Sequence, residues 1–263
     1  MGRPRRRTDA LTPPRSTRLG TAGLPGEARI GGSEERASLR SGREAGSWDE
    51  QYRNGRYRSE PPVAFVEDIL EAARSHDAMG GPGLYVGCGN GRNYLPLVAG
   101  GLDLFGLDIS RVAIEQLAAR APARRSRLIV GDISALPRDA RFAMVVGIQV
   151  FQHGRRAETH RHIQAAQDHV AGAGLFALRV NAVGTDTEHD HSETEHGSDG
   201  GLTISYLAGP KAGLDVHFFS ELELDRLFEG WEPAMALRSQ VTWRSPPARG
   251  QWTQWEGIWK RPG

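Results

Sequence analysis

The stretch GLYVGCGNG, residues 83–91, decides how this chain folds. An apolar run that ends in alternating glycines predicts a buried strand breaking into a tight turn. Glycine suits Gly87, Gly89 and Gly91 because the backbone turns with unusual dihedrals there and approaches a ligand without an intervening Cβ. The turn therefore predicts a site for a nucleotide-type cofactor.

The residue after the third glycine separates two classes of cofactor. The dinucleotide fingerprint G-x-G-x-x-G places Gly or Ala at its sixth position, which is Arg92 in this chain. The spacing G-x-G-x-G resembles instead the first motif of class I S-adenosylmethionine-dependent methyltransferases. This resemblance implies S-adenosyl-L-methionine as the cofactor, and it disfavours a nicotinamide oxidoreductase. It covers about residues 47–261, and the run GCGNGRN at 87–93 looks most like the tellurite-resistance and thiopurine branch.

Strand-like and helix-like patterns alternate along the rest of the chain. Strands are predicted at 83–87, 103–107, 127–131, 142–147 and 174–180. Helices are predicted from Pro62 onward and at 92–99, 110–120 and 155–169. Such alternation predicts an α/β fold with a parallel sheet and helices on both faces. Ligands bind such sheets at the carboxyl ends of the strands, where we expect the site.

The C-terminal region predicts a hairpin. Strand-like runs at 233–243 and 251–260 are joined by only seven residues, so they pair antiparallel, because a parallel crossover needs a dozen residues or more. The resemblance implies a Rossmann-like, seven-stranded, mostly parallel sheet with one antiparallel strand from this hairpin. Ahead of it, Ser220 and Glu223 predict a capping box at a helix start.

Composition limits the class and the location of the protein. The chain has 263 residues, a quarter of them charged, and a net charge of +1, which fits a globular protein of ordinary size. No apolar stretch is long enough to span a bilayer, so we expect no membrane partner. Cys88 is the only cysteine, which favours the cytoplasm. Basic residues are almost all arginine, with lysine only at Lys211 and Lys260, which indicates a GC-rich bacterial gene.

The N-terminal residues 1–46 are rich in arginine, Gly, Ser and Pro and poor in large apolar side chains. This composition predicts a disordered segment ahead of a methyltransferase domain at 47–263. A basic arm can also contact nucleic acid, but the segment has no aromatic residues for base stacking. A tail without function is therefore the favoured interpretation.

Two acids follow successive predicted strands. Asp108 lies 21 residues after Gly87, where an acid that accepts from the ribose hydroxyls is expected. The alternative role is a helix N-cap, which Ser110 fills better. Asp132 follows the next strand, and the resemblance implies that it accepts from the adenine amino group while Ile133 packs on the ring.

The resemblance implies further cofactor contacts, with buried aromatic packing as the open alternative for the segment WDEQY at 48–52. The family usually carries an acid where this chain has Tyr85, so the Tyr85 hydroxyl or nearby acids would have to hold the methionine amino group. The remaining cofactor candidates are Trp48, Tyr52, Cys88, Asn90, Asn93, Ile109 and Gln149.

His153 is the candidate general base. It follows the fourth predicted strand, where the family places polar side chains beside the transferring methyl group. An imidazole titrates near neutral pH and can take a proton from an attacking hydroxyl or amine. Capping the next helix is an equally good explanation of this residue.

Histidines and carboxylates alternate over 186–199. Such a run can ligate zinc or nickel, but it lacks a recognised ligand spacing and is more typical of a solvated loop. We therefore assign no metal ligand and interpret 185–217 as a lid over the active site.

Methyl transfer from a sulfonium needs few catalytic side chains, so the sequence motifs do not identify the methyl acceptor. No Asn-Pro-Pro-Tyr signature of nucleic-acid amino methylation follows the fourth strand, and a small-molecule acceptor is preferred. Two alternatives remain: a cofactor-binding module without transferase activity, and a nucleic-acid methyltransferase that uses the basic arm.

Overall fold

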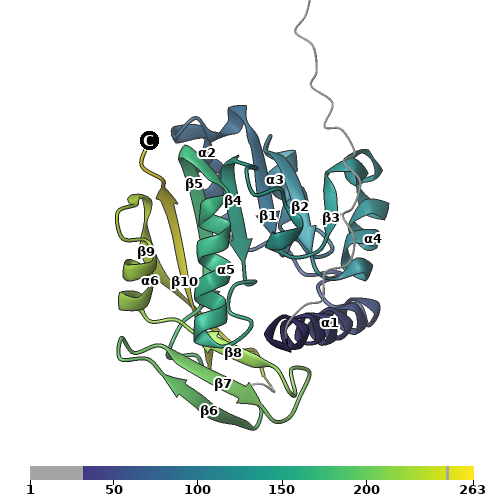
Figure 1. Ribbon diagram of the computed structural model, residues 1–263, viewed down its shortest axis with the longest axis vertical. Coiled ribbons are helices and arrows are strands. Elements are labelled where there is room, and N and C mark those ends of the chain that lie inside the picture. The colour runs from purple at the N-terminus through teal and green to yellow at the C-terminus, as the bar shows by residue number, and fades with distance from the viewer. Residues whose placement is uncertain (1–31, 247–248) are drawn as a thin grey trace, which may run out of the picture. The chain divides into compact units, whose positions relative to one another are not determined.

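A seven-stranded sheet forms the centre of the protein (Figure 1). The computed structural model describes residues 32–246 and 249–263. The strand order is β3-β2-β1-β4-β5-β10-β9, in which β1 to β5 pair parallel and β10 pairs antiparallel with both β5 and β9. The predicted mostly parallel sheet with a reversed strand from the C-terminal hairpin is confirmed.

The element bounds lie within a few residues of the predicted ranges. The strands of the central sheet are β1 (Pro82–Val86), β2 (Asp103–Asp108), β3 (Leu128–Val130), β4 (Phe142–Ile148), β5 (Val170–Asn181), β9 (Glu232–Trp243) and β10 (Gln251–Lys260). The helices are α1 (Gly32–Arg53), α2 (Phe65–Ser75), α3 (Tyr94–Ala99), α4 (Arg111–Arg120), α5 (Arg156–Asp168) and α6 (Glu221–Leu227). Short 3-10 turns occur at Ala78–Gly80, Pro122–Arg127 and Ile133–Ala135.

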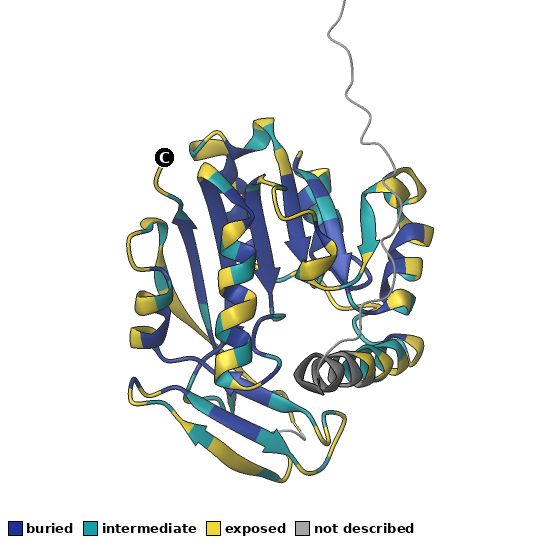
Figure 2. Cartoon of the chain, viewed as in Figure 1, coloured by how far each residue is buried: buried dark blue, intermediate teal, exposed yellow. Residues whose placement is uncertain are grey.

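Each face of the sheet carries its own hydrophobic core, because successive side chains of a strand point to opposite faces. On β1, Tyr85 packs into the core formed with α2, α3 and α4, whereas Leu84 and Val86 pack into the core formed with α5 and α6. Figure 2 shows the central strands buried and the outer faces of the helices exposed. The strands whose ends carry the predicted site thus belong to a sheet that is packed with helices on both faces.

The N-terminal boundary differs from the prediction. Residues 1–31 of the segment predicted to be disordered lie outside the described residues, but 32–46 belong to helix α1. Glu, Arg and Ala recur through this stretch and are good helix formers, which offsets its lack of apolar side chains. Two units, Met1–Ser38 and Leu39–Gly263, divide the chain, and the second holds the sheet and all of the site described below.

The segment interpreted as a loop, 185–217, forms a second sheet. Its three antiparallel strands are β6 (His191–His196), β7 (Leu202–Tyr206) and β8 (Asp215–Phe218). Ile204, Val216 and Phe218 give it a small core of its own. Most of its acids and histidines lie within 186–199, on β6 and next to it, which is why the sequence there resembles a solvated loop.

Among the residues that the structure describes, no helix is both long and apolar enough to cross a membrane.

Replacing Phe176 with Ala tests the core on the α5 face. Phe176 is fully buried on β5, and its ring lies 5.3 Å from that of Phe228 and 5.9 Å from that of Phe151. We expect the free energy of unfolding, measured by urea denaturation, to fall by about 3 to 5 kcal/mol. Leu222→Ala, at a side chain that is 49% exposed, is the matched control and should change it little.

Candidate active site

The glycine turn after β1 adopts the backbone conformation that its sequence predicts. Gly87, Gly89 and Gly91 have φ angles of +68°, +55° and +95°, a region that side chains other than glycine rarely adopt. A Cβ on Gly89 would lie 2.5 Å from the Tyr52 hydroxyl, and one on Gly91 would lie 2.5 Å from Leu117. The turn therefore has no room for side chains at these positions, because neighbouring residues pack directly against its backbone.

The carboxylate of Asp108 holds this turn. Its Oδ2 accepts from the backbone N–H of Gly89 and its Oδ1 from that of Ser110, both at 2.8 Å. Burial raises the pKa of Asp108, while these two hydrogen bonds act to lower it. Each carboxylate oxygen keeps a further lone pair, so the group can accept from two ribose hydroxyls. The donor set fits an adenosine-type cofactor, and Ser110 caps α4 as expected by accepting from Ala113 N–H at 3.1 Å.

The end of α1 docks on the same loop. Asp49 Oδ1 accepts from the Ser110 hydroxyl at 2.6 Å and from the N–H of Val112 at 3.1 Å. These bonds bring Tyr52, which is buried, against Gly89. Trp48 lies beside Tyr52, with ring centroids 6.3 Å apart. The WDEQY segment is thus both packed and placed at the glycine turn.

Other predicted cofactor residues hold the loop together. Cys88 is buried, which raises the pKa of its thiol. Asn90 is buried and donates from Nδ2 to the carbonyl of Arg56 at 3.2 Å. Asn93 is also buried, and its Oδ1 accepts from the N–H of Val63 at 3.0 Å. These contacts stabilise the loop, and contact of the three side chains with a cofactor stays a prediction.

Tyr85 lies inside the core and not on the surface of the site. Its side chain is 1% exposed, and its ring meets that of Tyr94 edge-on with centroids 6.3 Å apart. Burial raises the pKa of its hydroxyl, and a hydrogen bond with the Asn93 side chain acts in the opposite direction. In this position Tyr85 supports the turn by packing, and its expected contact with a methionine amino group is untested.

Asp132 stands at the end of β3, next to the Asp108 strand. Gly131 N–H donates to the carbonyl of Asp108 at 2.9 Å, which fixes the spacing of the two loops. Asp132 is exposed, and its Oδ1 accepts from the N–H of Ser134 at 2.8 Å and from its hydroxyl. Ile133 is half-buried beside the core of the α5 face. An N-cap is the role observed for Asp132, and adenine recognition stays a prediction.

The segment after β4 faces α1. Gln149 has a φ of +56°, and its N–H donates to the carbonyl of Arg179 at 2.7 Å. His153 lies edge-on to Trp48, with ring centroids 5.0 Å apart. Burial and the charges of Lys211 and Arg56 lower the pKa of His153 from 6.5 to about 3. The imidazole is therefore neutral near pH 7, the form that accepts a proton.

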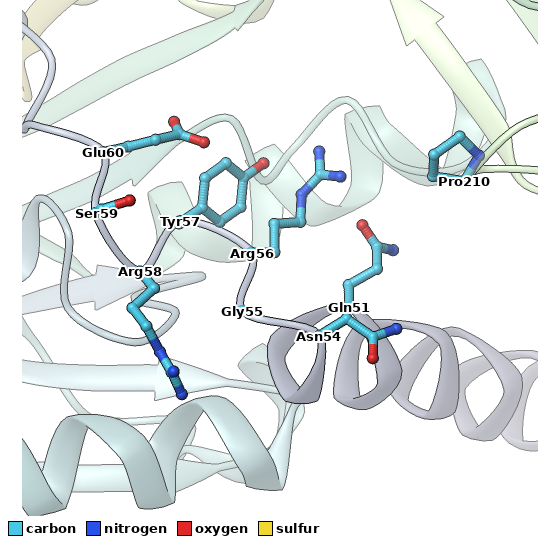
Figure 3. A pocket seen from close by; sticks show the side chains of 9 residues that line it. All are labelled: Gln51, Asn54, Gly55, Arg56, Tyr57, Arg58, Ser59, Glu60 and Pro210. Carbon is cyan, nitrogen blue, oxygen red and sulfur yellow. The ribbon is translucent and has the colours of Figure 1, made fainter.

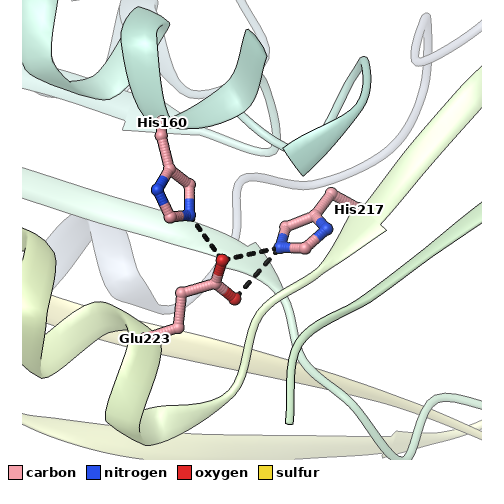
Figure 4. Close-up of side chains that lie close together, drawn as sticks. All are labelled: His160, His217 and Glu223. Atoms are coloured by element: carbon pink, nitrogen blue, oxygen red, sulfur yellow. Dashed lines mark hydrogen bonds and ion pairs between the residues drawn. The ribbon is translucent and has the colours of Figure 1, made fainter. Parts of the chain in front are cut away.

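Three side chains from different elements meet where the second sheet joins the central one (Figure 4). His217 on β8 and Glu223 on α6 are fully buried, with His217 Nε2 3.0 Å from both carboxylate oxygens. His160 on α5 bonds to the same carboxylate. The predicted capping box is therefore only half-formed. Ser220 accepts from Glu223 N–H at 3.1 Å, but the Glu223 carboxylate bonds to the histidines and not to the backbone of Ser220.

This cluster is an ion network with its charges balanced by neighbours. Its ligand-type atoms lie within 4.8 Å of one another, which is compatible with a divalent cation. However, Arg156 donates to Glu223 at 2.9 Å and pairs with Asp199 at 2.5 Å, and Arg226 also pairs with Asp199. Two arginines therefore compensate two buried acids, and the side chains suffice to join α5, α6 and β8.

Sequence reasoning missed three polar residues at this end of the sheet. Gln51 and Arg56 flank the predicted Tyr52, and Lys211 lies in the β7–β8 connection. The signal that could have found Lys211 is its rarity, since it is one of two lysines in an arginine-rich chain.

Comparison with known proteins agrees with this geometry. Residues 84–174 match the model of a methyltransferase domain family, a segment that runs from β1 into β5. No curated protein matches the chain. The fold is that of class I methyltransferases, so the predicted fold class is confirmed.

Solved structures share the fold at low sequence identity. The 1,6-didemethyltoxoflavin-N1-methyltransferase of Burkholderia thailandensis is 16% identical with a TM-score of 0.60, covering 91% of this chain and 94% of its own. TehB from Haemophilus influenzae is 16% identical with a TM-score of 0.54, at 81% and 67% coverage. The CcbJ methyltransferase from Streptomyces caelestis is 16% identical with a TM-score of 0.54, at 79% and 95% coverage.

Replacing Glu223 with Gln tests the ion network. Removing one charge leaves buried cationic and imidazole partners uncompensated, so we expect a loss of about 3 to 5 kcal/mol in the free energy of unfolding at neutral pH. Folding lowers the pKa of Glu223 from 4.5 to about 2, because His160 and His217 donate hydrogen bonds that outweigh the opposing effect of burial. Its contribution is therefore complete above pH 4.5 and disappears as the pH falls towards 2.

Denaturation curves of both proteins at a series of pH values check this expectation. The difference between wild type and Glu223→Gln should shrink over that acidic range. Glu221→Gln, at an exposed residue of the same helix, is the control. An equal loss in both variants would contradict the role given to Glu223.

Proposed function

We propose that this protein is an S-adenosylmethionine-dependent methyltransferase that transfers a methyl group to a small-molecule acceptor. The observation that carries the proposal is the bond between Asp108 and the N–H of Gly89, which places a buried carboxylate against the glycine turn at the end of β1. The match of residues 84–174 to a methyltransferase domain supports it. So does the fold shared with the toxoflavin-pathway enzyme, which was crystallised with S-adenosylhomocysteine and its small-molecule substrate.

The cofactor would be held along the ends of β1, β2 and β3. Asp108 and Ile109 would hold the ribose, and Asp132 and Ile133 would hold the adenine. The glycine turn, Trp48, Tyr52 and Gln149 would hold the methionine end. When bound, S-adenosylmethionine supplies a methyl group that is already activated on a sulfonium, so the protein needs little covalent chemistry of its own.

The chain's own residues align the acceptor and exclude water. Tyr52 is buried over the turn, and Trp48 packs against His153, which closes the side of the site nearest α1. His153 is a neutral imidazole and receives the proton that a hydroxyl or amine acceptor releases. The second sheet, 185–217, acts as the lid of the acceptor side.

We further propose a cytoplasmic enzyme of bacterial origin. A single, buried cysteine and the preference for arginine over lysine support this location and source. The two alternatives, a binding module without transferase activity and a nucleic-acid methyltransferase, have no support among the observations above.

Isothermal titration calorimetry with S-adenosylhomocysteine tests the proposed function directly. We expect saturable binding at one site per chain, because the glycine turn and Asp108 are already arranged for an adenosine. NADH should not bind measurably, since Arg92 stands where the dinucleotide fingerprint needs a small residue. Binding of NADH without S-adenosylhomocysteine would overturn the proposal.

Asp108→Asn should weaken S-adenosylhomocysteine binding at least about tenfold, because an amide loses one charged acceptor to both the turn and the ribose. Asp139→Asn, at an exposed acid after β3, removes the same charge and should bind as wild type does. Thermal melting of both variants separates lost affinity from lost folding. Equal affinities for the two variants would remove Asp108 from the cofactor site.

A further inference from the structure

Positive charge gathers beside the proposed catalytic end of the sheet. An open pocket of about 480 Å³ lies between the loop that follows α1 and the β7–β8 connection (Figure 3). Arg56 and Gln51 extend towards the segment that carries Pro210, whereas Arg58 points away from it. Lys211 is the next residue along that segment. The lining residues are Gln51, Asn54, Gly55, Arg56, Tyr57, Arg58, Ser59, Glu60 and Pro210.

Several buried polar atoms here have no hydrogen-bond partner among the described residues. They are both amide atoms of Gln51, Nε of Arg56, Oε1 of Gln152 and Nδ1 of His153. Buried polar groups are nearly always satisfied, and leaving one unpaired costs about 1 to 3 kcal/mol. Gln51 and Arg56 line the pocket, whereas Gln152 and His153 belong to the turn after β4, and His153 packs on Trp48. A ligand that reached both segments would satisfy these atoms together.

The positive charges of two side chains at this site, Arg56 and Lys211, are also uncompensated by acids. Among the side chains that the structure describes, neither Arg56 nor Lys211 forms an ion pair, although the ion network at Glu223 balances its arginines with acids. Burial and the charge of Arg56 lower the pKa of Lys211 from 10.5 to about 8. The same two cations depress the pKa of His153. An anion placed between them would relieve all three groups at once.

Aromatic rings set the orientation of these cations. The Arg56 guanidinium lies 4.8 Å from the ring of Tyr57 and 5.9 Å from that of Trp48. Trp48 is in turn edge-on to His153. A guanidinium fixed in this way presents a planar pair of donors, which suits a carboxylate or a similar oxyanion.

We propose that the methyl acceptor is an anionic small molecule whose carboxylate or other oxyanion binds Arg56 and Lys211, with its nucleophile beside His153. This inference rests on the proposed function and names the substrate class of that site. The pocket has the volume of a small-molecule site. A nucleic-acid backbone would instead need a continuous row of cations, and here two stand together.

Occupation of this anion subsite, defined by Arg56 and Lys211, also bears on His153. Burial lowers the pKa of His153 most, and the charges of Lys211 and Arg56 lower it further. A bound anion offsets these two charges, so it raises the pKa of His153. A base with a pKa near the working pH transfers protons best. The acceptor thus improves the base that deprotonates it, and neutral molecules of the same shape do not.

The two lysines of the chain allow a direct test by NMR. Protein labelled with ¹³C-lysine gives signals from Lys211 and Lys260 only, and Lys260→Arg assigns them. In the presence of saturating S-adenosylhomocysteine, titration with benzoate should shift the Lys211 signal saturably and raise the pKa of its amine. The Lys260 signal is the internal control and should stay in place, and benzamide, the neutral isostere, should shift neither.

Variants connect the shift to the pocket. Arg56→Gln should weaken benzoate binding at least about tenfold, as should Lys211→Met when binding is followed by calorimetry. Arg161→Gln, at an exposed arginine of α5, should bind as wild type does. Thermal melting confirms that each variant is folded.

The outcomes separate this inference from the proposed function. If S-adenosylhomocysteine binds but neither benzoate nor inorganic phosphate moves the Lys211 signal, the anion subsite is wrong and the proposed function stands. A benzamide shift equal to that of benzoate, or unchanged benzoate affinity in Arg56→Gln, also overturns it. If S-adenosylhomocysteine itself fails to bind, the proposed function fails first.

Discussion

The carboxylate of Asp108 is the group on which the geometry of the site depends. It accepts from Gly89 on one side and from Ser110 on the other, so the turn after β1 and the start of α4 are fixed by a single side chain. The Ser110 hydroxyl donates in turn to Asp49, which links the start of α4 to the end of α1. The aromatic and cationic residues that follow Asp49 owe their position to this chain of hydrogen bonds. A conformationally unusual backbone is thus stabilised by one buried charge.

Buried charge is compensated differently on the two sides of the proposed site. At the cofactor side, backbone N–H groups compensate a buried acid, and burial is what raises its pKa. At the proposed acceptor side, Arg56 and Lys211 form no ion pair among the described side chains, and burial together with their charges lowers the pKa of His153. The Glu223 network shows that the fold does neutralise buried charge where the role is to join elements. The imbalance beside His153 is therefore specific to the site.

Much of the fold was predictable because local patterns and tertiary structure agree. The glycine turn, the strand periodicity and the short link before 251–260 predict the parallel strands and the antiparallel C-terminal hairpin, both of which the structure shows. Helix 32–53 and strands β6 to β8 were not foreseen, since their polar sequences resemble solvated segments. Asp108 was identifiable from its spacing. Arg56 and Lys211 were not, because they lie more than 150 positions apart in the chain and no local sequence motif links them.

The boundaries of the matched domain have an evolutionary consequence. Residues 84–174 hold the glycine turn, Asp108 and His153, whereas Gln51, Arg56 and Lys211 lie before or after them. Most of the proposed cofactor site is thus encoded by one continuous block, and most of the proposed acceptor wall by two flanking segments. Under the proposed function, chimeras built at the edges of that block would change the acceptor wall while they keep the glycine turn and Asp108.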